Sequence, residues 1–364
     1  MTTALRLRRA PVDIVLVGGA LAISALGVVM VASATRSGPG GSTPYVARQL
    51  VWVALGTGAM AAAMAVDVDR LRRLSPLAYG LVLAALVAVL SPMGAKVNGA
   101  QAWFDLGPFR VQPAELAKPV LIVVLAAHGA RAGGRFGGGR LLGALLLAAP
   151  AVGLTLLQPD LGTAIVLAVV TAGLVVTAGA PTRQLVLLGL AGLLGALGGL
   201  RAGVLEPYQV ERLTGFLHQS SDPRGATWNL DQAKIAIGSG GVAGAGLFAG
   251  SQTALDYVPE AHTDFVFTVV GEELGLLGGV SLLGLFSLVA WRIWRAAVRA
   301  PDTFTALCCT GVLAMIGFQV FENVGMTMGL TPITGIPLPM VSYGGSATVA
   351  CLAAVGLVAN ISRG

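Results

Sequence analysis

Long apolar runs separated by short polar segments make up most of this chain. A helix needs about 20 apolar residues to cross a bilayer, and fewer where neighbouring protein covers its ends. Judged by that length, the pattern predicts ten spans, at about 12–34, 49–66, 74–92, 113–129, 141–157, 162–180, 184–202, 264–291, 303–324 and 345–361. We therefore expect an all-α polytopic membrane protein.

The basic residues of the short connections predict the orientation, because lysine and arginine gather on the cytoplasmic side. Arginines precede the first span and follow the second, fourth, sixth, eighth and tenth spans. Both termini are therefore expected in the cytoplasm and the long 203–263 loop outside. The first apolar run continues past the length of a signal peptide and shows no clear cleavage site, so we expect an uncleaved first span. The whole of 1–364 is expected to form one integral membrane domain.

Composition excludes other classes of protein. Only 11% of the residues are charged, against about 25% in a soluble domain. The net charge of +6 is dispersed among apolar runs and does not form the basic stripe of a nucleic-acid-binding protein. The three cysteines, Cys308, Cys309 and Cys351, lie inside apolar segments, where cysteine packs as a small apolar residue.

A polar stretch directly before the eighth span carries the first candidate site. Asp256, Glu260, His262 and Asp264 fall within nine residues of an otherwise acid-poor chain. Ionisable groups that enter a membrane are costly and indicate a functional site, although clustered charges also mark ordinary membrane boundaries. We expect His262 to act more as a structural hydrogen-bond donor than as a catalyst.

Further ionisable groups lie near the outer ends of other spans. Glu115 and Lys118 share one face of the fourth span, and Asp160 lies in the outer turn before the sixth. A transport path would leave polar groups at several depths, so this pattern favours a chamber that opens outwards. Glu272 and Glu273 lie deeper in the eighth span, where pairing within the bundle and a direct role are equally compatible with the sequence.

The long outer loop contains two expected interfacial helices, around 208–213 and 227–237, followed by a glycine-rich run at 238–246. Such a run could cradle phosphate through its N–H groups. It lacks the preceding strand and the following lysine of a nucleotide loop, which favours a compact turn. The proline-rich stretch 332–339 is expected to form a rigid wall.

The ordered set of these motifs resembles the SEDS family (shape, elongation, division and sporulation) over about residues 12–361. The marks are Asn98-Gly99-Ala100 with Trp103, Gln112 to Lys118, Gln158 to Thr163, Tyr208-Gln209 with Arg212, Ile235 to Gly241, Leu255 to Gly275, Asn323 to Met326 and Pro332 to Gly345. The versions at Ile237-Gly238-Ser239-Gly240-Gly241 and 332–339 resemble the elongation branch, RodA, more than the division branch.

The resemblance implies a peptidoglycan glycosyltransferase of the inner (cytoplasmic) membrane, which polymerises lipid II outside together with a class B penicillin-binding transpeptidase. Asp264 matches the essential aspartate of the family, and Glu115, Lys118 and Asp160 match other polar positions of its chamber. The family has a basic residue just before the tryptophan, where this chain has Gln101-Ala102. Lys96 or Arg110 would have to replace that base.

This chemistry assigns expected roles to the candidate residues. Asp264 is the expected general base for the acceptor hydroxyl, and Lys118 and Arg212 are expected to bind the pyrophosphate. Glu115 would orient Lys118 or hold a divalent ion. No His/Cys ligand spacing occurs, so a metal would be a hard Mg²⁺ or Mn²⁺ bound through oxygen.

Two rival interpretations belong to other classes of protein. A lipid II flippase predicts polar groups near both leaflets and an internal repeat, and neither is apparent in the sequence. A passive scaffold for the transpeptidase leaves the polar chamber without a purpose.

Overall fold

The computed structural model describes residues 11–37, 41–97, 99–107, 109–131, 136–201, 226–255 and 257–363. Within them, each of the ten predicted spans coincides with a helix. These are α1 (Ile14–Ala34), α2 (Thr43–Ala65), α3 (Val68–Val89), α4 (Pro113–Ala130), α5 (Gly138–Leu157), α6 (Leu161–Thr177), α7 (Thr182–Arg201), α11 (Val266–Val298), α12 (Thr303–Thr327) and α13 (Gly345–Ile361).

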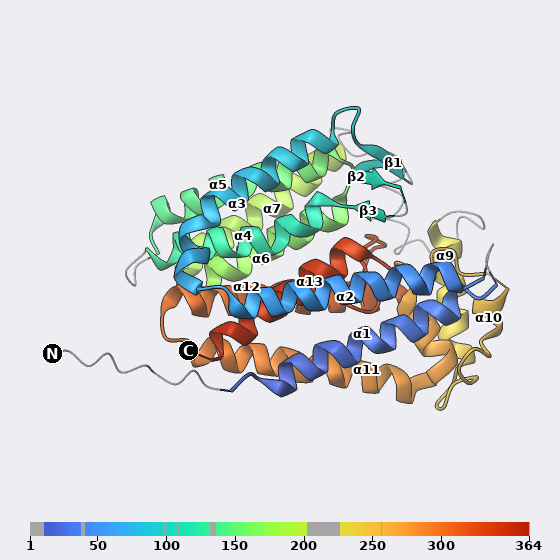
Figure 1. Ribbon diagram of the computed structural model, residues 1–364. Coiled ribbons are helices and arrows are strands. Elements are labelled where there is room, and N and C mark those ends of the chain that lie inside the picture. The colour runs from blue at the N-terminus through green and yellow to red at the C-terminus, as the bar shows by residue number, and fades with distance from the viewer. Residues whose placement is uncertain are drawn as a thin grey trace.

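The helices lie side by side in one bundle (Figure 1). Seven of those described are long and apolar enough, by length and composition, to cross a membrane, and α6 and α13 are shorter apolar helices. The chain is therefore a multi-pass, mostly helical membrane protein, while the count of ten crossings and the orientation of the termini stay predictions.

Two helices, α4 and α12, form the centre of the bundle. α4 packs against α3, α5, α6, α12 and α13, and α12 also packs against α6 and α11. Local sequence sets where these helices begin. Pro113 occupies the first turn of α4, where a missing N–H costs nothing, and α12 begins with a capping box of Asp302 and Thr305.

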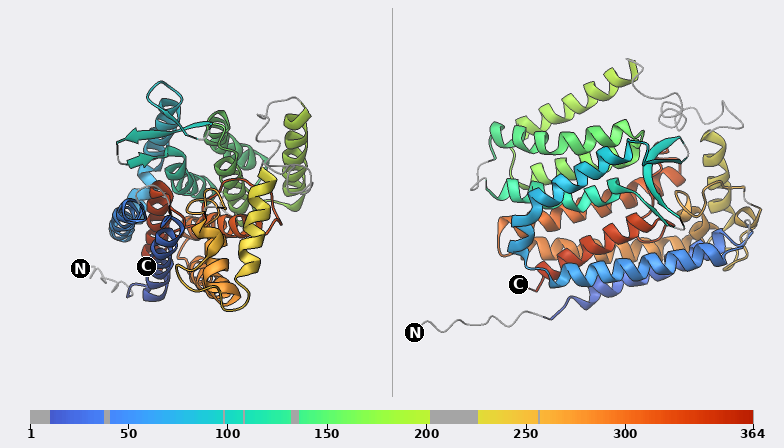
Figure 2. Two further views of the ribbon diagram at one scale, coloured as in Figure 1. Left: turned by 90° about the vertical axis from the view of Figure 1, so that its right-hand side faces the viewer. Right: turned by 45° about the horizontal axis from the view of Figure 1, so that its top comes forward.

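A small antiparallel sheet, which the sequence analysis missed, lies at one end of the bundle (Figure 2). Its strands are β1 (Ala95–Val97), β2 (Ala100–Leu106) and β3 (Phe109–Val111). The sequence analysis assigned no strand between the third and fourth spans, because two of the strands have three residues each and such short strands give no periodic signal. We call this end of the bundle the sheet end.

α11 differs from its predicted range of 264–291. It continues to Val298 and is interrupted at Gly275, where φ is +64°, a conformation that favours glycine. The segment 240–250, which we call the strap, crosses the helix there. Leu276 N–H donates to Gly241 O, and Ala245 N–H donates to Glu272 O, both over 2.9 Å. Backbone groups freed by the kink are thus satisfied by the strap.

The outer loop is described only in part. Helix α9 (Ala226–Ser239) confirms the helix expected around 227–237, and α10 (Ser251–Ala254) follows the strap. The glycine-rich run forms compact turns against α11. A Cβ atom at Gly244 would lie 2.1 Å from Glu273 O, so the strap needs glycine for its close approach. The helix expected around 208–213, including Arg212, lies outside the described residues.

Candidate active site

A cavity of about 730 Å³ opens at the sheet end of the bundle. Its walls come from α2, the sheet, the first turns of α4, α6 and α13, the turn before α11, and the loop 333–337. That loop, which contains Gly335 and Pro337, forms a wall without regular secondary structure. The cavity thus lies where the sequence predicted a polar chamber.

Four of the predicted site residues line this cavity together, although they come from separate parts of the chain: Glu115, Asp160, His262 and Asp264. The grouping follows from the fold, because each residue lies at the sheet-end terminus of a helix or in the turn before one. Lys118 lies behind Glu115 with only 1% of its surface exposed.

The Glu115–Lys118 pair has the predicted geometry. Lys118 Nζ donates to Glu115 Oε1 over 2.6 Å, and both side chains are almost completely buried. Glu115 Oε2 is buried without a hydrogen-bond partner among the described residues. The pair therefore leaves one buried oxygen of a cavity-lining residue without a partner in the described part of the chain, while the Lys118 ammonium is buried beside it. Direct contact of Lys118 with a ligand stays a prediction.

Asp160 shapes the cavity wall. Its Oδ1 accepts from Thr163 N–H over 3.0 Å and caps α6, while its Oδ2 accepts from Gln112 Nε2 over 2.7 Å. Because Gln112 directly precedes α4, this carboxylate joins the beginnings of two helices. Its contacts are those of a structural residue at the cavity surface.

His262 belongs to a cluster of three aromatic rings on the cavity wall. Its ring centroid lies 5.3 Å from that of Tyr45 and 5.6 Å from that of Tyr343. The carbonyl of His262 accepts from Tyr343 N–H over 2.8 Å. These contacts fix the turn that leads to Asp264 against α2 and against the segment just before α13.

Asp264 lies in the turn that directly precedes α11 and is half-buried in the cavity wall. Its backbone carbonyl accepts from Asn323 Nδ2 over 2.8 Å. The residue therefore combines a charge, an open volume beside it and a fixed backbone.

Two arginines add positive charge to the cavity, Arg48 on α2 and Arg110 on β3. Of the two bases proposed to replace the missing family position, the lining includes Arg110, whereas Lys96 is exposed on β1 opposite Gln101. Sequence reasoning missed Arg48. Its signal was the i−3, i+4 spacing to Tyr45 and Trp52, which puts three cavity-lining side chains on one face of α2.

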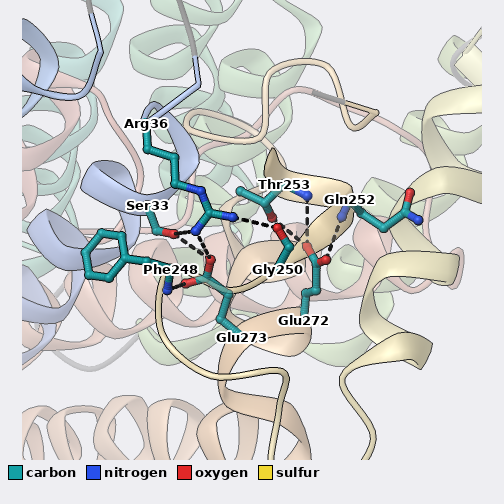
Figure 3. Close-up of polar contacts among 8 residues, drawn as sticks. All are labelled: Ser33, Arg36, Phe248, Gly250, Gln252, Thr253, Glu272 and Glu273. Atoms are coloured by element: carbon teal, nitrogen blue, oxygen red, sulfur yellow. Dashed lines mark hydrogen bonds and ion pairs between the residues drawn. The ribbon is translucent and has the colours of Figure 1, made fainter. Parts of the chain in front are cut away.

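Glu272 and Glu273 are bound within a separate network (Figure 3). The Glu272 carboxylate accepts from the N–H groups of Gln252 and Thr253, over 2.7 and 3.0 Å, and from the Thr253 hydroxyl over 2.6 Å. Glu272 therefore caps α10 and anchors the end of the strap.

Glu273 binds the strap to α1. Its Oε1 accepts from Ser33 Oγ over 2.5 Å and from Arg36 over 3.2 Å, and its Oε2 accepts from Phe248 N–H over 3.1 Å. Arg36 also donates to Gly250 O over 2.6 Å. Of the two interpretations that the sequence left open, the contacts favour pairing within the bundle.

Among the described residues, no group of three or more His, Cys, Asp and Glu side chains is arranged to hold a metal. The acidic residues of the cavity come from separate walls. A hard cation bound here would need ligands from a phosphate in addition to Glu115 Oε2.

The chain resembles known proteins over almost its whole length. A family model described as a cell cycle protein, of the FtsW, RodA and SpoVE group, matches residues 14–364. A probable peptidoglycan glycosyltransferase FtsW from Alkalilimnicola ehrlichii is 40% identical, over 94% of this chain and 86% of the relative.

Solved structures agree with these matches. A chain of a peptidoglycan synthase complex, described in terms of how polymerization and crosslinking are coordinated, is 37% identical with a TM-score of 0.82, covering 97% of this chain and 98% of that one. The rod shape determining protein RodA of Thermus thermophilus is 35% identical with a TM-score of 0.72, covering 97% of both chains. The cavity, its acidic residues and the match over the full bundle lead to one conclusion: the chain belongs to the SEDS family of FtsW, RodA and SpoVE.

Proposed function

We propose that this chain is a peptidoglycan glycosyltransferase that polymerises lipid II, with the cavity at the sheet end as its active site. The observation that carries the proposal is the cavity, where acidic and basic side chains face one open volume in an otherwise apolar bundle. The glycosyltransferase name of the FtsW relative supports this reaction class.

The proposed chemistry transfers a sugar from a polyprenyl pyrophosphate donor. The Asp264 carboxylate takes the proton of the acceptor hydroxyl, the acceptor oxygen bonds to the anomeric carbon of the donor, and the bond from that carbon to the pyrophosphate breaks. The leaving group takes the electron pair of that bond and needs positive charge nearby. Arg48 and Arg110 supply such charge at the cavity wall, and Lys118 and Arg212 remain proposed contributors.

Glu115 lines the cavity and pairs with Lys118 behind it. Glu115 Oε2 lacks a partner within the described residues, so it is the oxygen that would join phosphate oxygens in holding Mg²⁺ or Mn²⁺. Such an ion would neutralise charge on the leaving pyrophosphate.

The sheet end is proposed to face the outside of the cytoplasmic membrane, where a polyprenyl-linked substrate has its tail in lipid and its headgroup at the surface. Labelling tests this orientation. Single cysteines at Ser221 and Ala132, in a background without the native cysteines, should react with an impermeant thiol reagent from opposite sides. Reaction from the same side would overturn the orientation.

A class B penicillin-binding protein is the proposed partner. The resemblance to a chain of a peptidoglycan synthase complex supports this assignment. A role in cell elongation is proposed from the sequence of the 237–241 and 332–339 motifs. Rescue of rod shape in a bacterium depleted of its elongation polymerase, without rescue of a division mutant, tests it.

Purified full-length protein in detergent, incubated with lipid II, tests the proposed reaction. We expect glycan chains from the wild type and polymerisation lower by about 10²–10⁴-fold in Asp264→Asn at equal folded concentration. Detergent provides no second leaflet, so a flippase would leave lipid II unchanged. A folded, monodisperse wild type that makes no polymer in detergent, or in nanodiscs with a class B partner, would reject the proposed function.

A further inference from the structure

The carboxamide of Asn323, near the sheet end of α12, joins the two loops that border the cavity. The residue is fully buried. Its Nδ2 donates to Asp264 O and to Ile336 O, each over 2.8 Å. An amide nitrogen carries two hydrogens, and here each of them bonds to the backbone of a different loop.

Both loops line the cavity. One contributes His262, Thr263 and Asp264, and the other contributes residues of 333–337. Because one nitrogen bonds to both backbones, the two loops lie next to each other, and their separation sets where the Asp264 carboxylate stands relative to the 333–337 loop. Asn323 is therefore placed to fix one dimension of the site without lining the cavity itself.

The second loop is a rigid reference for this bond, because it is held from both sides. Glu322 Oε1 accepts from the Thr334 hydroxyl over 3.0 Å, so α12 holds the loop at a further point. On the other side α6 packs closely, and a Cβ atom at Gly162 would lie 2.6 Å from Thr334 O. Asn323 therefore bonds the backbone of Asp264 to a loop that is itself held in place.

We propose that Asn323 is a positioning residue for glycosyl transfer, which holds Asp264 at the distance at which its carboxylate meets the acceptor hydroxyl. This inference rests on the proposed function and adds a residue to it. Reacting groups must be held close to their productive geometry, and a displacement of about 1 Å can cost about 10²-fold in rate. Loss of both hydrogen bonds removes the link between the Asp264 backbone and the 333–337 loop, while the His262 contacts still hold the start of the turn.

The alternative explanation is purely structural: Asn323 only donates to two backbone carbonyls that need hydrogen-bond partners in any fold. The chain contains a matched control for that role. Asn360, at the opposite end of the bundle, donates from its Nδ2 to Ala63 O over 3.0 Å and to Val66 O over 2.6 Å. It makes the same kind of bonds, joins α13 to α2, and lies away from the cavity.

The test compares Asn323→Ala, Asn323→Ser and Asn360→Ala in the purified full-length protein. It measures thermal stability, kcat and KM for lipid II, and lipid II binding in the absence of turnover. We expect both Asn323 variants to bind lipid II as the wild type does, with kcat lower by about 10²-fold in Asn323→Ala and by less in Asn323→Ser, whose hydroxyl keeps one donor. Asn360→Ala should lose stability while its kcat per folded molecule stays unchanged.

The other outcomes of this test separate the proposed function from the inference about Asn323. A wild type without polymerase activity rejects the proposed function, and this inference with it. An active wild type whose Asn323 variants keep the kcat of Asn360→Ala rejects the inference alone. Failure of both Asn323 variants to fold, while Asn360→Ala folds, would also reject it, because Asn323 would then serve stability only.

Discussion

The acidic residues near the beginning of α11 have two different kinds of surroundings. Asp264 precedes the helix and, with Glu115, borders an open cavity. Glu272 and Glu273 lie in the helix, and both carboxylates accept hydrogen bonds from the strap, α10 or α1. A membrane-embedded acid therefore does not indicate a reaction site by itself. Asp264 has open volume beside it, as a reaction-site residue needs, whereas both oxygens of Glu273 accept hydrogen bonds, as in a structural residue.

The largest expected effect comes from exchanging one acid of each group for its amide. Asp264→Asn should lower lipid II polymerisation by about 10²–10⁴-fold, the usual contribution of a general base, without loss of folded protein. Glu273→Gln should keep the turnover of the folded fraction, because this side chain lies in the strap network. Turnover and melting temperature are measured on the same preparations. Equal turnover in the two variants would remove the distinction between the groups.

Glu115 and Lys118 combine features of both groups, since they form a buried pair and Glu115 also lines the cavity. Removing one partner leaves an uncompensated buried charge, which costs about 3–5 kcal/mol of stability. Glu115→Gln and Lys118→Met should each destabilise more than the double variant does.

Turnover decides whether this pair belongs to the site. We expect the double variant to recover stability but not lipid II turnover. Recovery of both together would mean that the pair only stabilises the bundle.

The strap network should respond in stability alone. Arg36→Ala removes a partly exposed ion pair to Glu273 and a bond to Gly250 O. A hydrogen bond to a charged group contributes about 1.5–3 kcal/mol, and partial exposure lowers that contribution. We therefore expect Arg36→Ala to lower the free energy of unfolding by about 2–3 kcal/mol. Chemical denaturation in detergent measures it, with Arg292→Ala, which breaks the pair to Asp13 near the other end of α11, as the control. A large fall in turnover per folded Arg36→Ala molecule would connect the strap to the reaction.

Sequence alone predicted the helices well, because apolar runs of spanning length have few other structures available to them. It also predicted that Asp264, Glu115, Asp160 and His262 share a polar chamber, since each lies at the same end of its span. It could not predict the partners of Glu273. Arg36 lies far from Glu273 in the sequence, and the strap packs against α11 at the place where this helix is interrupted at Gly275. The end of α11 was also misjudged, since Arg292 and Arg295 indicated a boundary where the helix continues with Arg295 over the Trp291 ring.

The smallest expected effect concerns the two arginines of the cavity, which differ in their neighbours. Arg110 lies 3.7 Å from Asp105, and both side chains are about half exposed. Within the described part of the chain, no ion pair to Arg48 is found. A phosphate would therefore gain more from Arg48 than from Arg110, whose charge is partly offset.

Arg48→Ala should raise the KM for lipid II by about 10-fold, which corresponds to about 1.4 kcal/mol, while Arg110→Ala should raise it less. Arg48→Lys should recover part of the loss, because it restores the charge without the fork of donors. Kinetics at two ionic strengths check the cause, since added salt weakens exposed charge interactions and should narrow the gap between wild type and Arg48→Ala. A KM that is unchanged in Arg48→Ala would remove Arg48 from the pyrophosphate site and leave Arg110, Lys118 and Arg212 as its candidate bases.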